Sequence, residues 1–190
     1  MGIKVEREVK FSMSSWKQGE TMLMNARGEA LGPRCFELNS LFDFPTGTLR
    51  KRGEALRLRR VQDRAWLTFK GPAQGVEGMK HRNEYETSLD DADAVERILE
   101  AIGMEEQFRY EKYRQTYRLR DIEACLDETP IGFFIELEGE ADGIGEAIRD
   151  LKLSMDRALS LDYPTLYANH RSRFPAAPRF MVFPEDRQPR

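Results

Sequence analysis

Glu6, Glu8 and Lys10 stand two positions apart near the start of the chain, in the segment VEREVKF. Carboxylates this close together suit a hard divalent cation, and a neighbouring ammonium suits an anionic oxygen. Alternation with a period of two predicts a β-strand that carries its charge on one face. The other face holds Val5, Arg7, Val9 and Phe11. This strand therefore offers two acids and a base to one side of a sheet.

The same alternation recurs further along, so charge gathers on one face of several predicted strands. The acidic members of the set are Glu6, Glu8, Glu84, Glu86, Asp127, Glu136 and Glu138. The basic members are Lys10, Arg57, Arg59, Lys70, Arg82, Lys112 and Arg114. Arginine binds phosphate oxygens with two parallel hydrogen bonds, and carboxylates hold the metal that accompanies a polyphosphate. Both groups are what phosphoryl chemistry requires.

Alternation alone leaves two arrangements open. An antiparallel sheet commonly has one solvated face, and the charged positions can simply face water. In the alternative, the charged faces turn inward and line a wet tunnel, since a barrel of about eight strands has room for one small ligand. A period of two assigns residues to the sides of a strand without saying which side lies inside.

The elements that must position these residues follow from the rest of the pattern. The predicted strands cover residues 5–11, 35–44, 55–62, 65–70, 80–87, 108–119, 122–127 and 133–140, and the predicted helices cover 17–31, 91–102, 142–151 and 155–161. Connections between strands are too short for the roughly dozen residues of a parallel crossover, so antiparallel pairing is favoured. We expect one α+β domain over 1–170 and a Pro/Arg-rich tail over 171–190, of which 180–183 is the part able to dock.

Composition argues against several classes of function. Thirty basic residues against 33 acidic ones give a net charge of -3, which disfavours a nucleic-acid binder. Only two cysteines and two histidines occur, without paired spacing, so a His/Cys zinc site is excluded and any metal must be a hard ion such as Mg²⁺ or Mn²⁺. The charged N-terminus lacks an apolar core and no run reaches the roughly 18 apolar residues of a membrane span, so we expect a cytoplasmic protein without a membrane partner.

Taken together, these segments resemble the CYTH superfamily, the triphosphate tunnel metalloenzymes. The first strand is similar to the ExExK motif of that family, as Glu6-x-Glu8-x-Lys10. The blocks ALRLRR (55–60), LTFKGP (67–72), HRNEYE (81–86), EKYRQTY (111–117) and CLDETPIGFFIELEGE (125–140) follow in the family's order. Six ordered blocks over roughly residues 1–165 make the match specific. The resemblance implies a closed eight-stranded antiparallel β-barrel, with the charged faces inside and the helices packed outside.

The resemblance also implies roles for the charged residues. Lys10, Arg57, Arg59, Lys70, Arg82 and Arg114 look like the catalytic grip on the triphosphate, with Lys112 as a further substrate-binding residue. Glu6, Glu8, Asp127, Glu136 and Glu138 are similar to the metal-binding carboxylates, and Glu84 and Glu86 join the lining without an assigned role. In the family, a C-terminal helix can add another basic residue, for which Lys152, Arg157 and Arg171 are the candidates.

The activity that the resemblance implies is metal-dependent hydrolysis of inorganic tripolyphosphate, thiamine triphosphate or a nucleoside triphosphate. A class IV adenylate cyclase, which makes cyclic AMP and pyrophosphate from ATP, is the alternative, and a non-catalytic polyphosphate-binding module is a third hypothesis. Phe11, Trp66 and Tyr163 are predicted to be packing aromatics rather than a base-stacking platform, and no adenine pocket is recognisable, which favours hydrolysis. The expected partner is the small triphosphate itself, and a homodimer is left open.

Overall fold

The computed structural model describes residues 4–76 and 79–188 of the chain. Its strands are β1 (Lys4–Met13), β2 (Glu29–Ala30), β3 (Cys35–Asp43), β4 (Ala55–Val61), β5 (Arg64–Lys70), β6 (Gln74–Val76), β7 (Met79–Leu89), β8 (Glu105–Leu119), β9 (Ile122–Thr129) and β10 (Gly132–Glu138). The α-helices are α1 (Trp16–Asn25), α2 (Thr48–Lys51), α3 (Ala92–Ala101), α4 (Ala141–Asp150) and α5 (Tyr163–Arg173), and two 3₁₀ turns lie at Met155–Arg157 and Glu185–Arg187.

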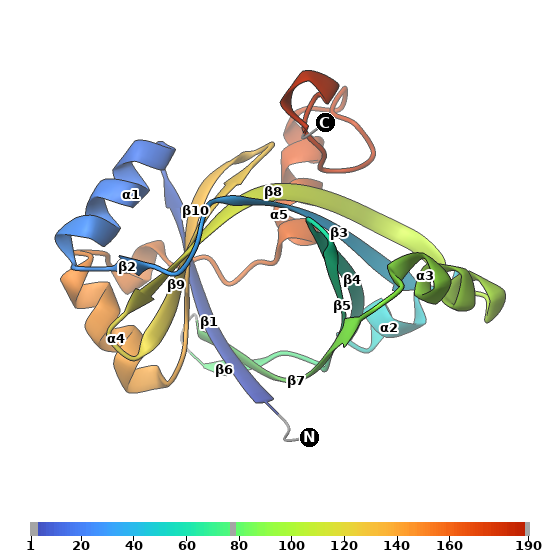
Figure 1. The fold of residues 1–190 in the computed structure, drawn as a ribbon, viewed down its shortest axis with the longest axis horizontal. Helices are drawn as coiled ribbons and strands as arrows, with labels where there is room; N and C mark the ends of the chain where they lie inside the picture. The colour runs from blue at the N-terminus through green and yellow to red at the C-terminus, as the bar shows by residue number, and fades with distance from the viewer. Residues whose placement is uncertain (1–3, 77–78, 189–190) are drawn as a thin grey trace.

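Eight strands close into an antiparallel barrel in the order β1-β10-β9-β8-β3-β4-β5-β7, since β7 pairs back onto β1 (Figure 1). The short strands β6 and β2 attach to β7 and β8. Strands neighbouring in sequence are joined by tight turns or by a single helix, as the antiparallel expectation requires. The closed eight-stranded barrel confirms the fold that the resemblance implied.

Helices lie outside the barrel (Figure 1), and buried apolar side chains of the strands pack against them. The largest cluster lies under α1 and α4 and consists of Val9, Phe11, Leu23, Tyr117, Leu119, Ile122, Ala124, Leu126, Ile135, Leu137, Ile144, Ala147, Ile148 and Leu151. Each large side chain buried here contributes roughly 1.5–3 kcal/mol. Helix α1 approaches β9 so closely that a Cβ on Gly19 would lie 2.4 Å from Leu126 Cδ1. The side chain of Val5, which alternation assigned to this face, lies outside the described part.

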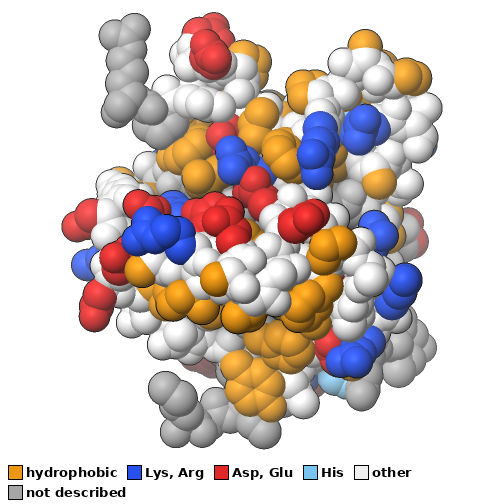
Figure 2. Space-filling model, turned by 90° about the vertical axis from the view of Figure 1, so that its right-hand side faces the viewer, with side chains coloured by type: hydrophobic (Ala, Val, Ile, Leu, Met, Phe, Trp, Pro, Cys, Tyr) orange, Lys and Arg blue, Asp and Glu red, His pale blue; other side chains and the backbone are white. Residues whose placement is uncertain are grey.

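A second cluster, of Phe42, Leu58, Leu99 and Met104, packs α3 against β3 and β4. Helix α3 begins where Asp91 accepts a hydrogen bond from the Ala94 N–H, which satisfies one of the free donors of its first turn. On the side of the molecule that carries α3, acidic and basic side chains are interspersed with apolar ones (Figure 2). Charge on this face is therefore mixed in sign.

The structure differs from the predicted elements in several places. Helix α1 ends at Asn25 rather than at residue 31, because Gly28 donates to the Leu23 carbonyl and closes the last turn. Residues 155–161 are helical only to Arg157, since Leu159 instead bridges to Lys10 of β1. The short elements α2 and β6 and the whole of α5 were not predicted.

The chain after α5 docks on the barrel, as expected for residues 180–183. Met181 is fully buried and forms a parallel bridge with Tyr110 of β8. Strand β9 pairs with β8 only as far as Tyr113, so the remainder of that β8 edge is free to receive the tail. The carboxylate of Glu111 accepts from the Phe183 N–H at 2.8 Å, which fixes the tail in place. No helix within the described residues is long and apolar enough to cross a bilayer.

Candidate active site inside the barrel

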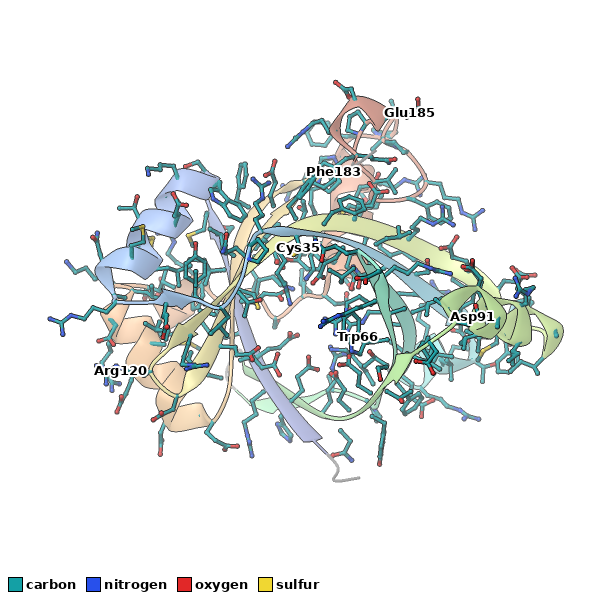
Figure 3. All side chains as sticks on the ribbon, viewed as in Figure 1. Cys35, Trp66, Asp91, Arg120, Phe183 and Glu185 are labelled. Carbon is teal, nitrogen blue, oxygen red and sulfur yellow. The ribbon has the colours of Figure 1, made fainter. Side chains whose placement is uncertain are left out.

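The inward faces of the strands enclose a cavity of about 270 Å³. Figure 3 shows side chains that extend from the strands into the ring that they form. Its wall carries seven cationic side chains, from Lys10, Arg57, Arg59, Lys70, Arg82, Lys112 and Arg114. Nine carboxylates share the wall, from Glu6, Glu8, Glu37, Glu84, Glu86, Glu123, Glu136, Glu138 and Asp162. Glu6, Lys10 and Lys112 are only 5%, 4% and 2% exposed, so these strand faces are not solvated surfaces. The charged faces point inward.

Glu6 on β1 is the centre of a first buried cluster with Lys70 of β5 and Arg82 of β7. Its carboxylate accepts from Lys70 Nζ at 2.6 Å and from Arg82 Nε at 2.8 Å. Burial alone would raise the pKa of Glu6, but these two cations hold it well below its ordinary value. Lys70 also lies 2.8 Å from Glu84, whose pKa is raised by burial and by the nearby Glu6. Glu6 therefore stays ionised and keeps both cations aimed into the cavity.

A second cluster joins β1, β10 and β8. Lys10 Nζ lies 3.0 Å from Glu136, and Arg114 contacts the other oxygen of the same carboxylate. Burial would raise the pKa of Glu136, but Lys10, Arg114 and Lys112 hold it well below its ordinary value. Lys10 also lies 4.1 Å above the ring of Tyr163, a cation–π contact. The bases of this wall are thus fixed by carboxylates rather than free to move.

Asp127 stands behind this wall and is fully buried. Its carboxylate accepts from Lys112 Nζ at 3.0 Å, from Arg114 at 2.7 and 2.6 Å, and from the Tyr163 hydroxyl at 2.7 Å. Burial would lower the pKa of Lys112, but the carboxylates of Asp127, Glu37 and Glu136 raise it. Asp127 therefore holds Lys112 and Arg114 in place from behind the wall, and both of its oxygens already accept hydrogen bonds.

Arg57 and Arg59 of β4 form a further part of the wall. Arg57 donates to Thr68 at 3.3 Å, and Arg59 donates to Glu86 at 3.2 Å. The Nε atoms of both arginines are buried and have no hydrogen-bond partner among the described residues. Buried donors of this kind are normally satisfied, so each can bind an oxygen atom of a ligand in the cavity.

The carboxylates of β1 and β10 suit a hard divalent cation. Glu8 stands opposite Glu138 across the antiparallel pair, and Lys10 stands opposite Glu136. No three acidic, histidine or cysteine side chains of the described residues already converge on a point that could hold a metal. Their oxygen donors are nevertheless those that Mg²⁺ and Mn²⁺ prefer. The excess of carboxylates over cations in the wall also means that a polyanion needs added positive charge, and the residues fit a metal bound together with substrate.

The sequence missed several residues that line the cavity, namely Glu37, Leu41, Ala55, Tyr110, Thr116, Glu123, Cys125, Asp162, Tyr163 and Pro164. Extending the period of two would have found some of them, since Tyr110 and Thr116 continue the row of Lys112 and Arg114 along β8. The next charge on the strand face of Glu37 is Asp43, six positions later, so the two acids gave no pattern of alternate charges. Glu37 is 5% exposed, and Lys112, Arg114, Arg59 and Arg57 lower its pKa to about 2 against the effect of burial.

Helix α5 contributes no base to the cavity. Lys152, Arg157 and Arg171 are all exposed, and none of them belongs to the lining formed by the described residues. Instead Asp162, Tyr163 and Pro164 at the start of α5 line the wall. Asp162 caps the helix by accepting from the Thr165 N–H at 3.0 Å, and Pro164 fits the first turn, where its missing N–H costs nothing.

Comparison with known proteins agrees with this geometry. Residues 4–162 match the model of the CYTH domain. A protein of Methanocaldococcus jannaschii, named "Putative adenylate cyclase", is 32% identical over 108 residues, which are 56% of this chain and 61% of that protein. The match therefore spans less than two thirds of the archaeal protein's length.

Solved structures share the barrel. One from Vibrio parahaemolyticus, described as a "putative adenylate cyclase", has a TM-score of 0.74 at 19% identity over 87% of this chain and 98% of its own. HpAC1 from Hippeastrum, described as a "putative adenylyl cyclase" with a dominant triphosphatase activity, has a TM-score of 0.65 at 17% identity over 87% and 96%. Identities this low establish the fold alone. The family match over most of the chain, on a barrel lined by the expected strand faces, shows that this chain belongs to the CYTH family.

Proposed function

We propose that this protein is a divalent-metal-dependent hydrolase of a triphosphate-containing substrate, with Mg²⁺ or Mn²⁺ as the metal. CYTH proteins are divalent-metal-dependent enzymes, triphosphatases or adenylate cyclases, that act on small triphosphates. The family therefore narrows the activity to two reactions. They differ in whether water or a ribose oxygen is the nucleophile and in which phosphorus it attacks.

The observation that carries the proposal is a small cavity whose wall is mostly charged. At about 270 Å³ it lies below the roughly 300–1,000 Å³ of sites that enclose a drug-sized ligand. Its two aromatic residues, Tyr110 and Tyr163, pack on one another with ring centroids 5.6 Å apart. Such a wall suits a chain of phosphates. A cyclase must in addition hold the nucleoside so that its 3′-oxygen reaches the α-phosphorus.

In this proposal the cations of the wall neutralise the phosphate oxygens. Arg57 and Arg59 offer buried donors from β4, Lys112 and Arg114 lie two strands away on β8, and Lys10 comes from β1 farther round the barrel. As the terminal P–O bond breaks, negative charge shifts toward the departing diphosphate, and fixed cations stabilise that shift without reorganising.

We assign the metal to the carboxylates of β1 and β10. Glu8 and Glu138 would hold it, with Glu6 and Glu136 beside them. A bound divalent cation would supply polarisation of the phosphoryl group and position a water. Because Asp127 is fully buried behind the wall and is not among the residues that line the cavity, we place it outside this set, as a residue that positions Lys112 and Arg114.

The test is product analysis with purified protein, Mg²⁺ or Mn²⁺, and tripolyphosphate, thiamine triphosphate or ATP as separate substrates. Orthophosphate and the matching diphosphate are expected. Cyclic AMP with pyrophosphate would overturn the proposal and establish the cyclase, the second candidate, which is favoured by the name of the archaeal relative.

A matched pair of variants tests the metal assignment. Glu8→Gln keeps the side-chain shape and should raise the metal concentration for half-maximal activity at least tenfold. Arg7→Gln is the control, since Arg7 lies on the outer face of the same strand and pairs with Glu140 at 2.8 Å. If Glu8→Gln and the parent need the same metal concentration for half-maximal activity, Glu8 does not bind the metal.

A further inference from the structure

Trp66 faces the inside of the barrel, next to the cavity. Along β5 it shares its face with Thr68 and Lys70, two and four positions on. Lys70 lines the cavity, and Thr68 donates to Glu86 of the lining at 2.7 Å. Figure 3 labels Trp66 on the inner side of the ribbon. The guanidinium of Arg59, which also lines the cavity, lies 4.9 Å over the indole.

Trp66 lies at the end of the barrel away from α5. Strands β9 and β5 run in the same direction, because four antiparallel steps separate them in the order β9-β8-β3-β4-β5. Tyr163 of α5 contacts Asp127, near the end of β9. Trp66 instead lies near the start of β5, beside the β4–β5 hairpin. Its partner across the sheet, Ser88 of β7, is exposed to solvent.

The α5 end is filled. Tyr163 is 5% exposed and packs with Tyr110, Phe134, Tyr167 and Met181 in a buried cluster. A group attached to the triphosphate cannot leave through this aromatic cluster. The cavity is also smaller than sites that enclose a drug-sized ligand, so we place an attached group at the Trp66 end.

Packing does not account for Trp66. It is half-buried and belongs to none of the three hydrophobic clusters that the described residues form. It also makes no ring contact with another described aromatic residue, whereas Tyr110 and Tyr163 each contact two. The sequence predicted a packing aromatic at this position, and the structure places an indole with a cation beside a phosphate-sized cavity, at the end of the barrel away from α5.

We infer that Trp66 and Arg59 form a stacking platform for a flat aromatic ring, and that the substrate is an organic triphosphate carrying such a ring rather than inorganic tripolyphosphate. This inference rests on the proposed function. Indole and guanidinium planes both stack on heterocycles, and such stacking tolerates different rings. The triphosphate lies among the cations while the ring lies on Trp66, and this directs the terminal phosphate toward Lys10 and Lys112.

The chain provides a matched control in its other tryptophan. Arg34 lies 4.1 Å over Trp16, so the two tryptophans share the same cation–π arrangement. Trp16 begins α1 and packs against the outer hydrophobic cluster, away from the cavity. A change at Trp16 therefore removes an indole with its cation without touching the barrel interior.

The first experiment measures kcat/KM for ATP, thiamine triphosphate and tripolyphosphate. In Trp66→Leu, the ratio of kcat/KM for the better of the two organic substrates to that for tripolyphosphate should fall about 5- to 150-fold, the range expected for one lost stacking contact. Trp66→Phe, which keeps a ring, should restore most of the ratio, and Trp16→Leu should leave it within twofold. A ratio within twofold of the parent in Trp66→Leu would overturn the inference.

The second experiment separates this inference from the proposed function and needs no altered platform. In the Trp16→Phe protein all tryptophan fluorescence comes from Trp66. ATP or thiamine triphosphate should quench it at lower concentration than tripolyphosphate does. Quenching without turnover of any substrate would defeat the proposed function but keep the platform. Turnover of the organic substrates with no quenching would defeat the platform and keep the hydrolase.

Discussion

The Asp127→Asn substitution probes how the barrel holds its buried bases. The parent carboxylate is fully buried and accepts from Lys112, Arg114 and Tyr163 at 2.6–3.0 Å. Asparagine keeps the shape but loses the charge, and its NH₂ group must face a cation or a hydroxyl. Lys112 and Arg114 are then left in the interior with one compensating carboxylate fewer.

Removing one partner of a buried ion pair typically lowers the free energy of unfolding by about 3–5 kcal/mol, because the other charge stays buried without compensation. For a chain of this size each kcal/mol lowers the melting temperature by about 2–4 °C, so Asp127→Asn should melt about 6–20 °C below the parent. Thermal unfolding is followed by circular dichroism in metal-free buffer at neutral pH. Urea unfolding at 25 °C should give a loss of free energy of unfolding of about 3–5 kcal/mol.

Two hydroxyl deletions on α5 provide the comparison. Tyr163→Phe removes the hydroxyl that donates to Asp127. It should lower the free energy of unfolding by about 1–3 kcal/mol, because a buried carboxylate oxygen then lacks one of its donors. Tyr167→Phe removes a hydroxyl that donates to the Pro178 carbonyl at 2.8 Å, outside the barrel, and should cost less. If Asp127 instead bound the metal, Asp127→Asn would unfold within about 2 °C of the parent without metal and would lose only the shift that Mn²⁺ produces. That outcome would refute the reasoning.

Two further predictions concern stability. Glu37→Gln should lower the free energy of unfolding by about 3 kcal/mol near neutral pH, because folding lowers the pKa of Glu37 from 4.5 to about 2. This stabilisation is present above pH 4.5 and is lost as the pH falls toward 2. The urea unfolding curves of parent and variant should therefore converge over that pH range. By the same assay, Met181→Ala should lower the free energy of unfolding by about 2–5 kcal/mol, because the fully buried side chain anchors the tail. Met155→Ala, at a 39% exposed position, is the control and should stay within about 0.5 kcal/mol of the parent. Equal losses in the two variants would show that the tail is not part of the folded core.

The strand faces were predictable from the sequence, and their orientation was not. Alternation is local, so Glu6, Glu8 and Lys10 can be assigned to one side of β1 from the sequence alone. Whether that side faces solvent or the barrel interior depends on the pairing of β1 with β7, which joins segments about 75 residues apart. Neither segment carries a local sequence pattern that predicts this pairing. The resemblance to a known family, and not the periodicity, supplied the inward orientation that the barrel confirms.

The contacts of single residues were harder to predict. Asp127 shares its strand face with Cys125, so its side of the strand was evident. One of the hydrogen bonds to its carboxylate comes from Tyr163, 36 positions later in a helix that was not predicted. Helix α5 escaped notice because its apolar residues form only a weak stripe and a proline stands in its first turn. Glu37 was missed because the next charge on its strand face, Asp43, lies six positions away and the two make no run of alternate charges. Glu37 is nevertheless among the most deeply buried acids of the wall.

The balance of charge inside the barrel links the metal to the substrate in the proposed function. Most cations of the wall are already paired: Lys70 and Arg82 with Glu6, and Lys10 and Arg114 with Glu136. A triphosphate that binds these cations must displace the carboxylates, and a displaced carboxylate in a buried site is unstable unless another positive charge meets it. A divalent cation held by Glu8 and Glu138, beside Glu6 and Glu136, would provide that charge, so the metal and the triphosphate each lower the electrostatic cost of binding the other. The ion pairs of Glu6 and Glu136 therefore couple the binding of the metal to the binding of the triphosphate.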